Sequence, residues 1–391
     1  MFPAHVILLT FLLLHFQRAK IDLDILQLEI LTKVQAYTFA QALYRYGRNS
    51  PIPRDSDNDP YTVRSLQDFA TSDERRAANP FYSDFVAYSN DPNYANVIIV
   101  NTLAGTGKWG TKSSAQRTEM VVKTASYQVM YMYALAEMAD AHADCLVKDA
   151  NDNVGGAHAW DEVAAYLIGS LEGSTTGGSP DEEDGKLLWN LADKRAFKFQ
   201  AINFDGYAEI NSELLDLLFA GRGELDAYDC DNLAKTIERI QHLLLLPTIQ
   251  SSILYASLNQ GLADTTTAGG LADGEAFALA VLPVISKYDK DAAEIIAENM
   301  VFRDGVSPAQ DGPQVIADAF FQALDEFGYS CALVGAISDA DACHLLGGFA
   351  TVKDKSTSTS TAGRTSTSSS QSQSFVASLV VVICGLIYNL L

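Results

Sequence analysis

The stretch that decides the fold class spans residues 115–143 and reads AQRTEMVVKTASYQVMYMYALAEMADAHA. Its apolar residues recur with the period of an α-helix. Strand patterns are scarce by comparison, and 96–100 is the one short run of β-branched residues. Other segments share the helical periodicity, so we predict an all-α fold. The other predicted helices cover 21–46, 159–171, 185–199, 207–220, 231–258, 273–287, 290–300 and 313–327.

A weak internal repeat links this stretch to a later one at a constant offset of 122 residues. In both places a glycine-rich loop and a helix that starts with acidic residues follow, at 161–164 and at 274–277. Alanine-rich helices also match by chance. If the repeat is real, the protein consists of two similar helical halves around a central cleft. The matched pairs are Arg117 with Arg239, Gln128 with Gln250, Tyr133 with Tyr255, and Ala134 with Ala256.

The amino-terminal end is typical of a secretion signal. Its apolar run, 6–16, is too short to span a bilayer but has the length of a signal-peptide core. No Lys or Arg precedes the run, and Gln17-Arg18-Ala19 is a poor cleavage pattern. We predict a signal peptide over 1–19, followed by a helix and ordered loops over 20–115 and a helical core over 116–350.

The carboxyl-terminal end predicts a membrane tether. Residues 351–374 form a Ser/Thr-rich stalk or spacer, and 375–391 are apolar with no charge after them. A single-pass helix normally leaves Lys or Arg on its cytoplasmic side, whereas a small-residue site, a polar spacer and an apolar tail form a GPI-anchor signal. We therefore predict a GPI anchor attached between 356 and 363, with a transmembrane helix as the alternative.

Composition excludes some classes of partner. The net charge is -22, with 27 basic against 49 acidic residues and no basic patch. This balance argues against binding to nucleic acid or to an anionic membrane surface. Four cysteines precede the apolar tail, which fits two disulfides in an oxidising compartment. Of the three possible connectivities, we favour Cys331 with Cys343, which leaves Cys145 with Cys230.

Several short motifs fail on mechanical grounds. The acidic run 55–59 resembles a calcium loop, but Pro60 stands where glycine must turn and Leu66 where a bidentate Glu is needed. The segment 105–108 lacks the spacing of a phosphate-binding loop, and 169–173 misplaces the serine of a nucleophile elbow. A conventional hydrolase is therefore not expected.

The segment 155–169 has the pattern of half a metal site. On a helix, His158, Asp161 and Glu162 stand at positions i, i+3 and i+4, which places one imidazole and two carboxylates on one face. The alternative is an ordinary helix start, because acidic residues are favoured in a first turn by the helix dipole.

Further oxygen ligands are available on other predicted helices. Tyr127 and Tyr131 share a face at i and i+4, and Glu275 lies in the second half of the repeat. The alternative for the tyrosines is an aromatic core stripe beside Met130 and Met132.

Several stretches resemble one known family in the same order from about residue 116 to 349. They are 159–166 with 169–173, 191–195, 246–251 with Tyr255, 280–283 and 331–335. Together they resemble the algal iron-assimilating periplasmic proteins and the phytotransferrins. The resemblance implies capture of ferric iron with a synergistic carbonate at the cell surface, followed by internalisation with a surface reductase or endocytic partner.

Two details qualify the resemblance. The stretch Asp193-Lys194-Arg195 is flanked in relatives by a Cys pair, but here Ala196 and Gln200 occupy that region, which puts a local disulfide in doubt. Gly156, His158 and Asp161 are also similar to the GxHxxE signature of imelysin-like proteins, with Asp in place of Glu.

The implied cargo fits the chemistry of these side chains. Fe(III) is a hard cation that prefers carboxylate and phenolate oxygens and accepts imidazole. Carbonate would need a guanidinium or a helix N-terminus, for which Arg117, Arg195 and Gly156 are candidates. Our leading prediction is a GPI-anchored, all-α, ferric-iron-binding protein that is not an enzyme. The alternatives are an imelysin-like surface metallopeptidase that uses His158, and a surface adhesion or structural protein.

Overall fold

The computed structural model describes residues 16–52, 61–71, 79–149, 155–172, 185–204, 206–259, 269–303 and 308–337. Every regular element in these segments is a helix, and the only β pairing there consists of two isolated bridges, Pro51 with Val63 and Ile202 with Ala208. The run 96–100 lies inside a helix, Tyr94–Ala104. The all-α prediction is therefore confirmed, whereas the division into two similar halves stays a prediction.

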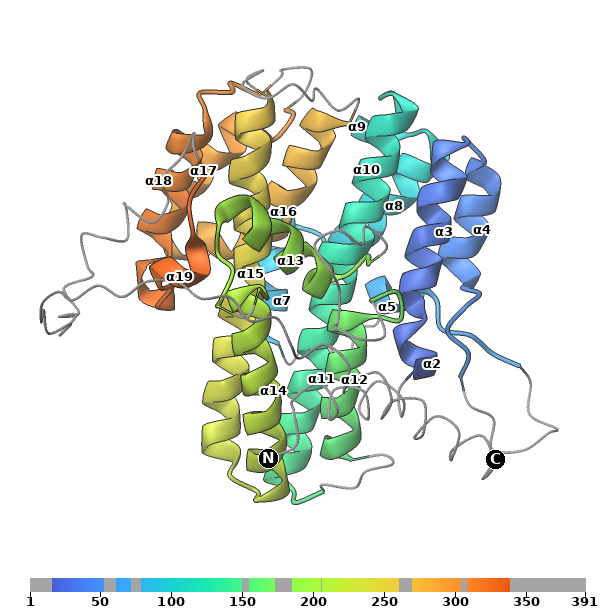
Figure 1. Cartoon of the computed structure of the whole chain (residues 1–391). Helices are drawn as coiled ribbons and strands as arrows, with labels where there is room; N and C mark the ends of the chain where they lie inside the picture. Colours follow the sequence, from blue (N-terminus) through green and yellow to red (C-terminus); the bar gives the residue numbers. More distant parts are fainter. Residues whose placement is uncertain are drawn as a thin grey trace, which may run out of the picture. The chain divides into compact units, whose positions relative to one another are not determined.

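The helices are distributed along the whole described chain (Figure 1). In order they are α2 (Phe16–Ala19), α3 (Ile21–Lys33), α4 (Tyr37–Tyr46), α5 (Leu66–Thr71), α7 (Pro80–Ser89), α8 (Tyr94–Ala104), α9 (Gly107–Gly110), α10 (Ser114–Thr124), the π-helical η1 (Ala125–Val129), α11 (Met130–Leu146), α12 (Gly156–Ile168), α13 (Leu188–Phe199), α14 (Glu209–Asp226), α15 (Cys230–Asn259), α16 (Gly270–Tyr288), α17 (Lys290–Met300), α18 (Pro313–Ala323), the 3₁₀ turn η2 (Asp325–Phe327) and α19 (Cys331–Val334).

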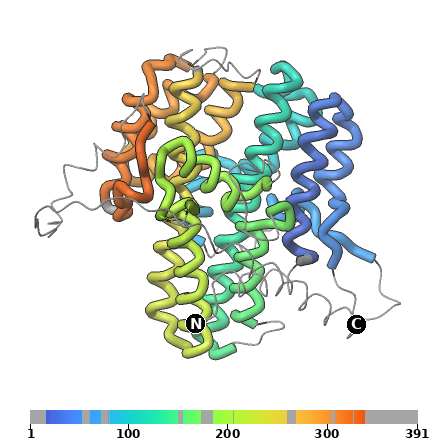
Figure 2. Tube along the Cα trace, viewed as in Figure 1, coloured from blue at the N-terminus to red at the C-terminus, as the bar shows by residue number. Residues whose placement is uncertain are grey.

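The predicted helix 115–143 is one continuous rod made of α10, η1 and α11 (Figure 2). It begins at a capping box, in which the Ser113 hydroxyl accepts from the Gln116 backbone N–H and the Gln116 side chain accepts from the Ser113 backbone N–H. The single π turn in its middle is a difference from the uniform α-helix that the periodicity predicts. Such turns add a residue to one helical turn and are frequent at functional sites.

Helices α10 and α15 both pack against α16, and α13 packs against α15. Helices α11 and α12 form a second close pair, with α14 beside α12. At the contact of α12 with α14, Trp160 lies over Gly221 and donates from Nε1 to the Leu218 carbonyl at 2.9 Å. A Cβ at Gly221 would lie 2.1 Å from Trp160 Cζ2, so the glycine permits this close approach.

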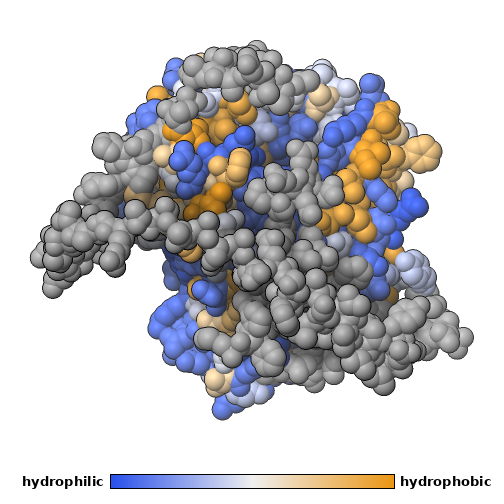
Figure 3. Space-filling model, viewed as in Figure 1, coloured by the Kyte–Doolittle hydropathy of each residue, from blue (hydrophilic) through white to orange (hydrophobic). Residues whose placement is uncertain are grey.

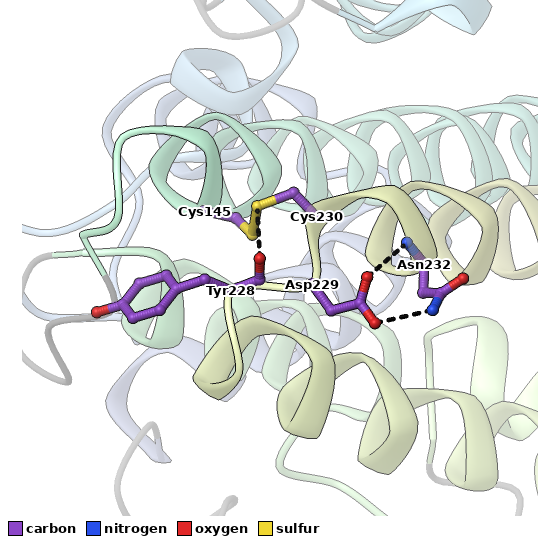
Figure 4. The surroundings of a disulfide bond; sticks show 5 residues. All are labelled: Cys145, Tyr228, Asp229, Cys230 and Asn232. Carbon is purple, nitrogen blue, oxygen red and sulfur yellow. Dashed lines mark hydrogen bonds between the residues drawn. A yellow bond between two sulfur atoms is a disulfide. The ribbon is translucent and has the colours of Figure 1, made fainter.

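One disulfide joins the end of α11 to the start of α15. Cys145 and Cys230 are bonded across 85 residues of sequence (Figure 4). The predicted pairing of these two cysteines is confirmed. The predicted bond from Cys331 to Cys343 cannot be placed, because Cys343 lies outside the described residues.

The two predicted sorting segments fall mainly outside the described residues, which start at 16 and end at 337. The signal peptide, the stalk and the anchor therefore remain predictions. None of the described helices is both long and apolar enough to cross a bilayer. Apolar side chains gather on the surface over α3 and α4 (Figure 3), where Ile30, Val34 and Phe39 are each more than half exposed.

Candidate metal and anion site

The predicted metal ligands occupy several different surroundings. His158 and Glu162 face one pocket, while Asp161, Glu275 and Tyr131 are each engaged elsewhere by groups of the protein. Tyr127 belongs to a further cluster of charged and aromatic side chains. The structure therefore does not bring the six predicted ligands together.

His158 and Glu162 lie on one face of α12, as their spacing predicts. The His158 Nε2 and Glu162 Oε1 atoms are 2.8 Å apart. Arg18 of α2 contacts both side chains, with its Nε 2.6 Å from Glu162 Oε1 and its Nη2 2.8 Å from His158 Nε2. Because arginine can only donate, the Nε2 lone pair of His158 is already used. Tyr166 donates to the other Glu162 oxygen at 3.0 Å.

Arg18, His158 and Glu162 line a pocket of about 660 Å³ between α2, α5, α11 and α12. Its remaining polar lining is mostly acidic and its aromatic wall consists of Phe69 and Tyr133, whose rings stack at 4.0 Å. The Arg18 guanidinium therefore takes the place beside His158 and Glu162 that a metal ion would need.

Asp161 and Glu275 are held by basic partners. Arg222 of α14 donates to both Asp161 oxygens at 3.0 Å. Glu275 is fully buried, where it pairs with Lys108 at 2.6 Å and accepts from the Phe302 backbone N–H at 3.0 Å. Burial raises the pKa of Glu275 to about 7, against the lowering effect of Lys108.

The two tyrosines contact different helices. Tyr131 is buried and donates to the Gln241 carbonyl of α15 at 3.4 Å, and burial raises its pKa well above the ordinary value. Tyr127 lies on the π turn and stacks on Phe277 of α16 with ring centroids 5.3 Å apart. Its hydroxyl makes no hydrogen bond to another residue that the structure describes.

A cluster around Lys123 gathers side chains from α10, η1, α13, α15 and α16. Lys123 forms ion pairs with Glu119 of its own helix and with Asp273 of α16. Tyr255 of α15 also stacks on Phe277, at 5.6 Å. We call this set the Lys123 cluster; its members are Glu119, Lys123, Tyr127, Arg195, Ser251, Tyr255, Asp273 and Phe277.

Arg195 is the second cation of the Lys123 cluster. The residue is only 9% exposed, and its Nε donates to the Ser251 hydroxyl at 2.6 Å. The guanidinium carbon lies 5.7 Å from the Phe277 ring centroid and 6.0 Å from that of Tyr255. No described carboxylate forms an ion pair with it, which is unusual for a buried arginine. Burial lowers the pKa of Arg195.

Burial and the two cations set the electrostatics of the cluster. Burial raises the pKa of Tyr127 to about 12 and that of Asp273 to about 6, although Lys123 lowers both. Burial also raises the pKa of Tyr255. For Glu119, burial is opposed by Lys123, and the net effect lowers the pKa of this carboxyl.

The two other predicted carbonate sites are occupied by protein groups. Arg117 donates to the carbonyls of Thr102 and Leu103 at the end of α8, and its guanidinium lies 3.6 Å from the Tyr37 ring centroid. The Gly156 N–H at the start of α12 donates to the Asp149 carbonyl at 2.9 Å. Arg195 differs from Arg117 in that its described acceptor is a side-chain hydroxyl, that of Ser251, and not a backbone carbonyl.

The sequence pointed to Tyr127 and Arg195 but not to the three charged members Glu119, Lys123 and Asp273 of the Lys123 cluster. Lys123 and Tyr127 stand at i and i+4, and Tyr255 appears in the proposed repeat, but Asp273 and Glu119 carried no recognisable signal. Within the described segments, no group of three or more His, Cys, Asp and Glu side chains could hold a metal ion. A metal in the Lys123 cluster would therefore need phenol oxygens in addition to its two carboxylates.

The fold and these contacts define an all-α protein in which charged side chains gather in the pocket beside Arg18 and in the Lys123 cluster. The chain belongs to the family of low iron-inducible periplasmic proteins, whose family model matches residues 17–345. No curated protein and no solved structure matches the chain. The resemblance inferred from the sequence is thus confirmed, and family membership relates the chain to iron assimilation.

Proposed function

We propose that this protein binds ferric iron together with carbonate in the Lys123 cluster and that it serves iron uptake at the cell surface. The observation that carries the proposal is Arg195, a buried guanidinium with no carboxylate partner among the described residues. Burying an unpaired charge is costly, so a small anion is the natural counter-ion. A guanidinium binds planar oxyanions such as carbonate in a bidentate manner.

The neighbours of Arg195 are the oxygen ligands that ferric iron prefers. Asp273 and Glu119 supply carboxylates, and Tyr127 and Tyr255 supply phenols without described hydrogen-bond partners. Hard, highly charged cations bind deprotonated oxygen ligands, and a metal ion lowers the pKa of the phenols that bind it. In this proposal carbonate lies against Arg195 and completes the coordination shell of the cargo.

The stretches that carry the family resemblance also support this location. Arg195 closes the stretch 191–195, and Ser251 closes the stretch 246–251. The fold brings these residues into hydrogen-bond contact, with Tyr255 one helical turn beyond Ser251. Binding and release then require no chemical turnover, and we propose a carrier tethered by a GPI anchor, not an enzyme.

Protons should compete with the bound metal. Phenolate and carbonate must both be deprotonated to bind iron, so affinity falls as pH falls. An acidic vesicle would therefore favour release after internalisation.

The test uses the purified ectodomain, residues 16–350, with ferric iron offered in the presence and absence of bicarbonate. We expect a phenolate-to-iron charge-transfer band that appears only with bicarbonate. The variant Arg195→Gln should lose this band, whereas the matched control Arg222→Gln, which changes an arginine outside the cluster, should keep it. Loss of all iron to a weak chelator, or a normal band in Arg195→Gln, would refute the proposal.

A further inference from the structure

The ammonium group of Lys123 lies between two carboxylates of the proposed site. It pairs with Glu119 one turn earlier on α10 and with Asp273 in the first turn of α16. The Lys123 side chain is 13% exposed, and that of Asp273 is 3% exposed. The two carboxylates thus share one buried monovalent cation.

Among the described residues, no third carboxylate forms an ion pair with this ammonium group. Its other close neighbours are the rings of Phe277 and Tyr255, at 5.4 and 5.8 Å from Nζ to the ring centroids. Arg195 lies against the same two rings and adds a second positive charge. A cation that enters the carboxylate pair must displace the ammonium group into this apolar and already positive environment.

We propose that Lys123 is a selectivity residue, which occupies the Glu119 and Asp273 pair and thereby keeps divalent cations out of it. The inference rests on the proposed function in that the same carboxylates are the ligands of ferric iron. A divalent ion that enters alone would leave Lys123 and Arg195 without enough negative charge around them. A trivalent ion that arrives with carbonate and ionises a phenol brings its own compensating anions.

Charge counting makes the difference concrete. The two cations and the two carboxylates of the Lys123 cluster sum to zero, although both carboxylates pair with Lys123 and none pairs with Arg195. A lone divalent ion adds two uncompensated charges to a buried site, which is strongly unfavourable. Fe(III) with one carbonate dianion and one phenolate adds no net charge, so the ammonium group can move aside without a net charge accumulating.

The experiment replaces the ammonium group by an apolar side chain of similar length. In Lys123→Met the carboxylate pair is left without a cation, and Mn²⁺ serves as the probe because it prefers oxygen ligands. We expect Lys123→Met to bind one Mn²⁺ at least about 100-fold more tightly than the wild-type ectodomain in bicarbonate-free buffer, by calorimetry. Mn²⁺ should also raise its melting temperature and not that of the wild type.

Two further variants make the result specific. Lys123→Met combined with Asp273→Asn should lose the gain in Mn²⁺ affinity. Lys287→Met removes a more exposed lysine paired with Asp84 at 3.0 Å, and it should gain nothing. If Lys123→Met does not fold, Lys123→Gln keeps a polar group in the same place and is expected to show the same gain.

A folded Lys123→Met or Lys123→Gln with wild-type Mn²⁺ affinity overturns the inference, and so does failure of both variants to fold in the presence of excess Mn²⁺. Retention of ferric iron by the wild type is measured separately. If the wild type retains iron but the Lys123 variants gain no Mn²⁺ affinity, only the selectivity role of Lys123 is rejected, and the ferric site stands. A Mn²⁺ gain without iron retention rejects the ferric site and with it the selectivity for iron.

Discussion

The Arg18 guanidinium lies 2.6 Å from Glu162 and 2.8 Å from His158, so α2 is joined to α12 through a largely buried ion pair. The contact spans 144 residues of sequence for Arg18 with Glu162. It adds a basic residue to a face of α12 on which the sequence predicted metal ligands. Arg18 lies inside the predicted signal peptide 1–19 and also within the segment 17–345 that the family model matches, so this contact exists only in a chain that keeps Arg18.

We expect Arg18→Ala to lower the free energy of unfolding by about 2 to 4 kcal/mol, because Glu162 would be left buried without its strongest partner. Urea unfolding of the ectodomain measures this loss. Lys33→Ala removes a mostly exposed lysine paired with Glu29 and should cost less than about 1 kcal/mol. Iron binding should be unchanged in Arg18→Ala; loss of iron there would favour His158 and Glu162 as the metal site.

The geometry of α12 illustrates how far spacing alone can predict a site. His158 and Glu162 are about 40° apart around a helix and do share a face, as expected from positions i and i+4. Asp161 and Glu162 are consecutive and therefore about 100° apart around the helix. Their carboxylates can thus reach partners on two different helices. Arg222 of α14 engages Asp161, and no local pattern in the sequence reveals that helix contact.

The Lys123 cluster could not be predicted from the spacing of residues in the sequence. Lys123 and Tyr127 are neighbours in sequence, but Arg195, Tyr255 and Asp273 come from three other helices. Their convergence depends on tertiary packing and on the π turn, neither of which has a periodic signature. The helices themselves were predictable, because apolar periodicity is a local property of the sequence. The bond between Cys145 and Cys230 was the favoured choice among three connectivities, and the fold is what brings these two cysteines together across 85 residues.

The contact of α12 with α14 predicts opposite effects for two glycines of one helix. At Gly221 an added Cβ would meet the Trp160 ring at 2.1 Å, whereas at Gly223 it meets nothing within 4 Å. We expect Gly221→Ala to destabilise the protein by about 2 to 4 kcal/mol through overpacking. Gly223→Ala should stabilise it by about 0.5 to 1 kcal/mol, because alanine favours the helix. Thermal unfolding of both variants tests this, and equal effects would contradict the packing argument.

A partly buried carboxyl, that of Glu172, lies outside the pocket beside Arg18 and outside the Lys123 cluster, and it predicts how stability depends on pH. Burial raises the pKa of Glu172 to about 8, and the nearby carboxyls of Asp193 and Asp22 add to the effect. Between the ordinary pKa of glutamate and about 8, the folded state holds a proton that the unfolded state has lost. Stability from this group is therefore present at low pH and is lost as pH rises through that window.

We expect Glu172→Gln to remove this loss, since glutamine keeps the shape without the charge. The variant should be more stable than the wild type at pH 9 by about 1 to 3 kcal/mol and nearly equal to it at pH 5. Urea unfolding at both pH values measures the difference. Glu294→Gln, at a nearly unburied carboxyl, is the control, and it should not show a gain that grows with pH. A Glu172→Gln gain of the same size at both pH values would reject burial of the charge as its cause.

The two phenols of the Lys123 cluster give the most direct spectroscopic prediction. Tyr127 and Tyr255 both stack on the ring of Phe277, and neither hydroxyl has a described hydrogen-bond partner. We expect Tyr127→Phe and Tyr255→Phe each to lower the iron charge-transfer absorbance and to weaken iron retention at least about tenfold, because each removes one oxygen ligand. Tyr131→Phe removes a phenol that donates to Gln241 instead, and it should keep the full band. If the band persists in the double variant Tyr127→Phe with Tyr255→Phe, the phenols that bind iron lie elsewhere, and the Lys123 cluster is not the ferric site.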